Sequence, residues 1–128
     1  MSTRSSIAVR KNDNEILNVS CHWDGYIEHN GKLLIHHYNT KEKALKLIRR
    51  GDISSLSDNI DKTIYQNEYM NDVKRKPIAD FDDMVLFEYN YKFDDMWYVK
   101  YSDKDWHPLQ NYFLTEVRKQ KIKEIFKK

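Results

Sequence analysis

The sequence predicts an α+β fold in which an antiparallel sheet, built from an N-terminal and a C-terminal β-hairpin, packs with about three helices. Two patterns predict this class: apolar residues alternate with polar ones near both ends of the chain, and they recur at helical spacing in between. The third observation is size. The chain has 128 residues with three Gly and two Pro, which favours one domain over 1–128 without a flexible linker.

The first predicted hairpin joins residues 5–10 to residues 16–24, both of which alternate in polarity. The turn between them is Asn12-Asp13-Asn14, and Asn tolerates the left-handed conformation that a three-residue loop requires. This loop length sets Val9 opposite Leu17. A slip of one residue would turn every apolar side chain to the other face, so the core selects this register.

The same register divides the residues after position 20 between the two faces of the sheet. Cys21 and Trp23 are expected to point into the core, whereas Arg4, His22 and Asp24 share the outer face. These three could form an exposed polar triad, but we favour a cross-strand salt bridge. A buried Cys is usually inert, which argues against a catalytic arrangement of Cys21 with its two polar neighbours.

Two helices are predicted in the first half of the chain. Residues 27–38 carry apolar side chains at helical spacing. For the following helix Asn39 is the expected N-cap, with Glu42 three residues later as in a capping box, and Gly51 ends it.

The second predicted hairpin pairs residues 87–93 with residues 97–101, where rings and branched residues alternate. A three-residue loop, Asp94-Asp95-Met96, aligns the apolar groups of both strands on one face, whereas a two-residue loop would split them. We therefore expect Trp97 to be buried in the core.

A third, basic helix is predicted over about 108–126, with Pro108 in its first turn. Ile122 and Phe126 are rotated away from the apolar stripe that begins at Leu109, so the end of this helix is expected to contact a second copy of the chain or a partner. Its excess of Lys and Arg could also meet nucleic acid, a partner that we do not favour.

Composition restricts the function classes. Lys and Arg total 22 against 20 Asp and Glu, so the formal net charge of +2 does not predict general nucleic-acid attraction. The nine Tyr, five Phe and three Trp suit interfaces as well as cores. The spacing of the five His and one Cys is not typical of a metal site, and no glycine-rich phosphate loop is present. We expect no cofactor, no metal, no catalytic residue and no membrane span, and a cytoplasmic location.

Several segments together resemble a known family. They are Ser2-Thr3-Arg4-Ser5, Cys21-His22-Trp23-Asp24-Gly25-Tyr26, Leu33-Leu34 with His37-Tyr38, Gly51-Asp52-Ile53-Ser54-Ser55-Leu56, Trp97-Tyr98-Val99 and Trp106-His107-Pro108-Leu109. The chain thereby resembles a widespread family of small bacteriophage and prophage proteins, although residues 62–80 depart from it. The resemblance implies a phage context rather than a reaction.

Three function classes follow, in order of preference. The first is a phage or prophage protein that binds and inhibits a host protein, for example a defence system such as a CRISPR effector. The second is a protein that sequesters a nucleotide-type signalling ligand, and the third is an enzyme of unknown class. The expected binding residues are Arg4, His22, Trp23, Asp24, Tyr26, Trp106, Ile122 and Phe126.

Overall fold

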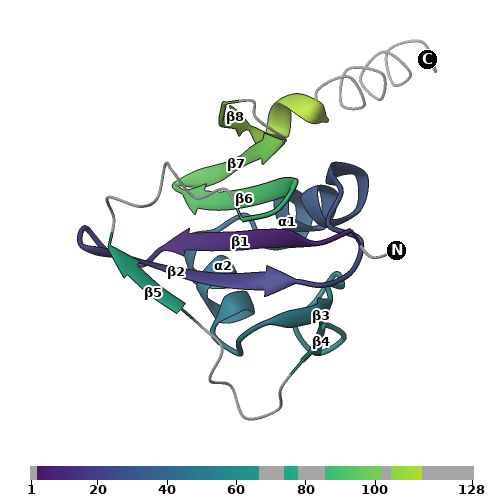
Figure 1. The fold of residues 1–128 in the computed structure, drawn as a ribbon, viewed down its shortest axis with the longest axis horizontal. Helices are drawn as coiled ribbons and strands as arrows, with labels where there is room; N and C mark the ends of the chain where they lie inside the picture. The colour runs from purple at the N-terminus through teal and green to yellow at the C-terminus, as the bar shows by residue number, and fades with distance from the viewer. Residues whose placement is uncertain (1–2, 67–73, 78–85, 102–104, 114–128) are drawn as a thin grey trace, which may run out of the picture.

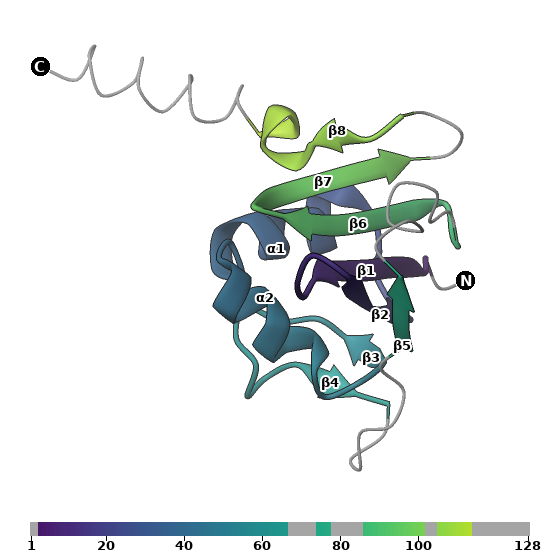
Figure 2. The same cartoon turned by 90° about the vertical axis from the view of Figure 1, so that its left-hand side faces the viewer.

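A mixed β-sheet with two α-helices on one of its faces forms the described part of the chain (Figures 1 and 2). The computed structural model describes residues 3–66, 74–77, 86–101 and 105–113. Seven strands follow one another in the order β4-β3-β2-β1-β6-β7-β8, and β5 also pairs with β2. Their bounds are β1 Ser5–Arg10, β2 Glu15–Cys21, β3 Ile53–Ser55, β4 Ile64–Tyr65, β5 Lys74–Pro77, β6 Tyr89–Asp94, β7 Met96–Tyr101 and β8 His107–Pro108.

Both predicted hairpins are confirmed with their predicted registers. In the first, β1 and β2 set Val9 opposite Leu17. In the second, β6 and β7 set Phe93 opposite Trp97, and Asp95 adopts a positive φ of 63° at the tip. An Asp tolerates this left-handed conformation better than most residues do.

The prediction of an antiparallel sheet is wrong, because β1 and β6 join the two hairpins in parallel. Ser5 pairs with Tyr89 and Val9 pairs with Phe93 along this junction. Local alternation determines the pairing within a hairpin, but it does not determine which edge of one hairpin meets the other, or in which direction. The parallel junction places both hairpin turns at the same end of the sheet (Figure 1).

The helical layer has two α-helices in the described residues instead of about three helices. A π-helix, η1 (Ile27–Gly31), leads directly into α1 (Lys32–His37), which agrees with the helix predicted over 27–38. The second helix, α2 (Lys41–Ile48), is capped by Thr40 and not by Asn39, since the Thr40 hydroxyl oxygen accepts from the Lys43 amide at 3.2 Å. Gly51, with φ 97°, follows its end as predicted.

The helix predicted over about 108–126 falls largely outside the described residues. After Pro108 the chain forms a short 3₁₀ helix, η3 (Leu109–Tyr112). Ile122 and Phe126, and with them the predicted self-association surface, fall in the part of the chain that is not described.

The core lies between the helices and the inward face of the sheet. Trp97 is 1% exposed, as predicted, and its indole N–H donates to the Tyr38 carbonyl at 2.9 Å. The opposite face is also buried at the centre of the sheet, where Ala8 and Ile16 lie. No helix in the described ranges is long and apolar enough to cross a membrane.

Candidate binding site at the end of the central strands

The hexapeptide Cys21–Tyr26 forms the turn that follows β2. The amides of His22 and Trp23 donate to Ile53 and Ser54 of β3, at 2.9 and 3.1 Å, so the chain stays attached to the sheet beyond the last strand residue. Asp24 then adopts a positive φ of 56°, which turns the chain toward η1. The turn is therefore held by main-chain hydrogen bonds.

Gly25 fixes this turn against β1. Its amide donates to the Thr3 carbonyl at 2.8 Å, and its carbonyl accepts from the buried Tyr91 hydroxyl at 2.7 Å. A Cβ atom at this position would lie 2.8 Å from the Arg4 carbonyl carbon and 2.8 Å from the Ser5 Cβ. Only glycine fits this approach between two segments of backbone.

The Cys21 side chain points into the core. It is fully buried, and the Asn30 amide donates to Sγ at 3.2 Å. Burial raises the pKa of the Cys21 thiol above its ordinary value, mainly by desolvating the thiolate. The predicted inward position is confirmed, and the raised pKa disfavours the thiolate that nucleophilic chemistry needs.

Trp23 lies on the surface, which contradicts its predicted place in the core. Its side chain is 45% exposed, because β2 ends at Cys21 and the alternation of faces ends with it. The Trp23 ring packs edge-on against the His22 ring, with centroids 4.7 Å apart. A large ring is thus presented to solvent from a turn that the sheet holds.

A cavity of about 170 Å³ opens beside this turn, on the side of the sheet away from the helices. We call it the Arg4 cavity. Its lining residues come from four separate parts of the chain: Arg4, Ser20, Cys21, His22, Gln66 and Phe87. Two residues predicted from the sequence, Arg4 and His22, therefore lie together as the hairpin register required.

Asp52 positions one side of the Arg4 cavity. Its carboxylate accepts from the Ser20 amide at 2.9 Å, and its carbonyl accepts from the Gln66 amide at 3.0 Å. One residue therefore holds the backbone of two lining residues that are 46 positions apart in the sequence.

Asn90 positions the other side. Its side-chain carbonyl accepts from the Phe87 amide at 3.2 Å and from the Ser6 hydroxyl at 2.8 Å, while its side-chain amide donates to the Phe87 carbonyl at 2.7 Å. Asn90 is fully buried. The aromatic wall of the cavity is thus fixed to the centre of the sheet.

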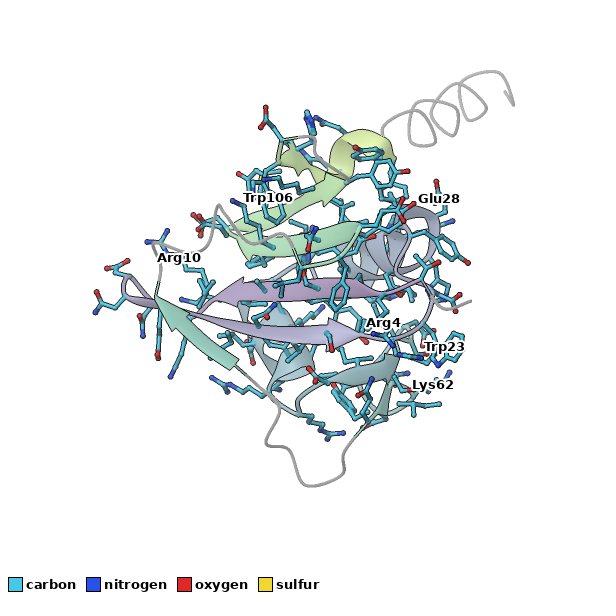
Figure 3. All side chains as sticks on the ribbon, in the orientation of Figure 1. Arg4, Arg10, Trp23, Glu28, Lys62 and Trp106 are labelled. Carbon is cyan, nitrogen blue, oxygen red and sulfur yellow. The ribbon has the colours of Figure 1, made fainter. Side chains whose placement is uncertain are left out.

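The predicted salt bridge of Arg4 is wrong. Within the described ranges, the Arg4 guanidinium makes no ion pair, and Asp24 does not line the cavity. Arg4 is exposed, and Figure 3 shows it at the same end of the sheet as Trp23. The positive φ at Asp24 takes its backbone out of the strand geometry on which the shared face depended.

Two further predicted residues lie elsewhere. Tyr26 is half-buried at the start of η1, with its ring centroid 6.0 Å from that of His29. Trp106 lies over β6 and β7, away from Arg4 and Trp23 (Figure 3), and the Lys92 ammonium is 4.5 Å from its ring centroid. Trp106 is therefore not part of the site at the end of β2.

Sequence reasoning missed Ser20, Gln66 and Phe87 as lining residues. Ser20 could have been found, because it shares the outer face of the second strand with His22. Gln66 and Phe87 carried no such signal, since pairings between distant segments bring them to the cavity.

No group of three or more His, Cys, Asp or Glu residues that could hold a metal ion occurs in the part of the chain that the structure describes. Comparison of the chain with family models, curated proteins and solved structures found no match.

Proposed function

We propose that this chain is a binding protein that contacts another protein through the surface around Trp23. The observation that carries the proposal is the 45% exposure of Trp23 in a turn held by main-chain hydrogen bonds to β3 and to Thr3. Trp is among the residues most enriched at the energetic centre of protein interfaces. A ring that is already fixed loses little conformational entropy on binding.

The neighbouring groups suit the rim of such an interface. Arg4 and His22 lie beside Trp23 and add charge and hydrogen-bond donors around the apolar ring. Interfaces typically combine a buried aromatic anchor with a polar rim. The resemblance to phage proteins supports a host protein as the partner, for instance a defence factor in the host cytoplasm.

The alternative is sequestration of a nucleotide-type ligand, and the size of the cavity gives it less support. Sites for small molecules typically enclose about 300–1,000 Å³. The Arg4 cavity has about 170 Å³, which suits one functional group and not a whole nucleotide.

The test compares capture of proteins from a phage-infected bacterial lysate by the wild-type chain and by Trp23→Ala. Truncating a hot-spot Trp costs about 2 kcal/mol or more, so we expect the affinity for the captured protein to fall about 30-fold. Tyr112→Ala is the matched control, because Tyr112 is also 45% exposed but lies in η3. It should bind as the wild type does.

A loss of capture because Trp23→Ala unfolds must be distinguished from a loss of the contact that Trp23 makes with the partner. Since Trp23 is on the surface, its replacement should leave the melting temperature within a few degrees of the wild type, as surface substitutions usually do. Undiminished capture by a folded Trp23→Ala variant would contradict the proposal.

A further inference from the structure

We propose that the Arg4 cavity binds an oxyanion of the size of a carboxylate or phosphate group. The lining of the cavity carries a positive charge. Arg4 carries a permanent positive charge, and none of the lining residues is acidic. Partly enclosed cations attract anions more strongly than fully solvated ones, since nearby protein lowers the effective dielectric constant.

The nearest acidic residues do not neutralise the cavity. The Asp52 carboxylate is engaged by the Ser20 amide at 2.9 Å, and Asp52 itself is not a lining residue. Asp24 forms no ion pair with Arg4 or with any other described residue. The attraction of the Arg4 guanidinium is therefore left for a group that enters the cavity.

The lining of the cavity also presents hydrogen-bond donors. Arg4, Ser20, His22 and Gln66 can each donate, and the described structure shows no hydrogen bond from any of their side chains to another described residue. An oxyanion accepts several hydrogen bonds at once, and those from a guanidinium are the strongest, often bidentate.

The backbone around the cavity is preorganised. Asp52 holds the backbone at Ser20 and Gln66, and Asn90 holds it at Phe87, through hydrogen bonds of 2.7 to 3.2 Å. These bonds exist before any ligand enters. Binding then orders mainly the side chains of the donors, which lowers its entropic cost.

The shape of the cavity favours a carboxylate carried by a partner. About 170 Å³ admits a carboxylate and its methylene groups, and the Phe87 ring offers those groups an apolar wall. Trp23 lies directly beside the cavity, through its contact with His22. The choice of an Asp or Glu side chain of the partner rests on the proposed function, whereas the oxyanion site itself does not.

The experiment titrates the isotopically labelled full chain with sodium acetate, inorganic phosphate and sodium chloride at matched ionic strength, and follows amide signals by NMR. We expect acetate to shift the Ser20 backbone amide and the Gln66 side-chain amide saturably. Arg4→Gln should weaken this binding about tenfold or more, because a charge-assisted hydrogen bond is lost. Arg49→Gln, at an exposed cation that follows the end of α2 and does not line the cavity, should leave acetate binding unchanged.

The outcomes distinguish a carboxylate from free phosphate as the ligand, and they test the oxyanion site independently of the protein-binding surface. Saturable binding of phosphate but not acetate would support the oxyanion site with free phosphate as its source. Equal shifts with chloride, or unchanged acetate binding in Arg4→Gln, would overturn the inference. Because the titration contains no partner protein, its failure would leave the capture result for Trp23→Ala standing, and failure of that capture test would leave the titration standing.

Discussion

Gly25 shows how a single residue determines the conformation of the binding turn. The turn passes so close to β1 that a methyl group would meet backbone and Cβ atoms at 2.8 Å. The buried Tyr91 hydroxyl also donates to the Gly25 carbonyl. The hexapeptide Cys21–Tyr26 is thus largely accounted for by packing and turn geometry, and Trp23 is the member that it presents to solvent.

We expect Gly25→Ala to destabilise the chain by about 1–3 kcal/mol, the usual cost of inserting a carbon into a filled space. Gly31→Ala is the matched control. A Cβ there would lie no closer than 3.1 Å to any neighbour, all of them side-chain atoms, against 2.8 Å from backbone at Gly25, and alanine is the better helix former. Urea unfolding measures the free energy of unfolding of both variants, and equal stability of the two would contradict the role assigned to Gly25.

The residues of the site could be predicted only where a hairpin register connects them. Arg4 and His22 share a face because β1 and β2 pair with a fixed register, which the sequence alone predicts. Trp23 was misplaced, because alternation carries no information about where a strand ends. Phe87 is bonded to Asn90, three residues away, and reaches the cavity because Asn90 and its strand pair with the distant β1, which no local pattern predicts.

Elements were predicted better than their ends. The loop of three residues and the apolar alternation select one register for each hairpin, and both registers were confirmed. The start of α2 was displaced by one residue, since Asn39 and Thr40 are both good caps and the spacing to Glu42 favoured Asn39. The structure selects Thr40, whose backbone is extended with φ −138° and ψ 156°.

The assignment of this cap predicts a difference between two adjacent substitutions. Thr40→Ala removes the acceptor of the Lys43 amide and should lower the free energy of unfolding by about 1 kcal/mol. Asn39→Ala should leave it within about 0.5 kcal/mol of the wild type, because Asn39 is exposed and its side chain makes no hydrogen bond with the described residues. Denaturant midpoints of the two variants show which residue caps α2. A larger loss in Asn39→Ala would restore the cap predicted from the sequence.

At the scale of the whole molecule, the parallel pairing of β1 with β6 joins two halves that are each locally predictable. The contact between Ile7 and Tyr91 connects residues 84 positions apart. Patterns of apolar residues do not specify such a junction, since both hairpins present free edges of similar character. The same junction brings Asn90 beside Ser6 and thereby builds the Arg4 cavity from both halves.

Buried and half-buried tyrosines in both halves of the chain predict that the chain loses stability in alkali. Burial raises the pKa of Tyr65 and of Tyr89 from 10.0 to about 12, and it also raises the pKa of Tyr38 and Tyr91. In the unfolded chain the pKa of these groups is about 10, so the folded state binds more protons between pH ~10 and ~12. Their contribution to stability is complete below pH ~10 and is lost as the pH rises toward 12.

The measurement is the free energy of unfolding in urea at several pH values from about 8 to 11. Tyr65→Phe should be less stable than the wild type at pH ~8, because the hydrogen bond from its hydroxyl to the Leu47 carbonyl is lost. Its stability should nevertheless fall less steeply above pH ~10, because one group with a raised pKa has been removed. The two proteins differ only at position 65, so the difference between the two slopes isolates this tyrosine. Equal slopes would show that the Tyr65 hydroxyl ionises as readily in the folded chain as in the unfolded one.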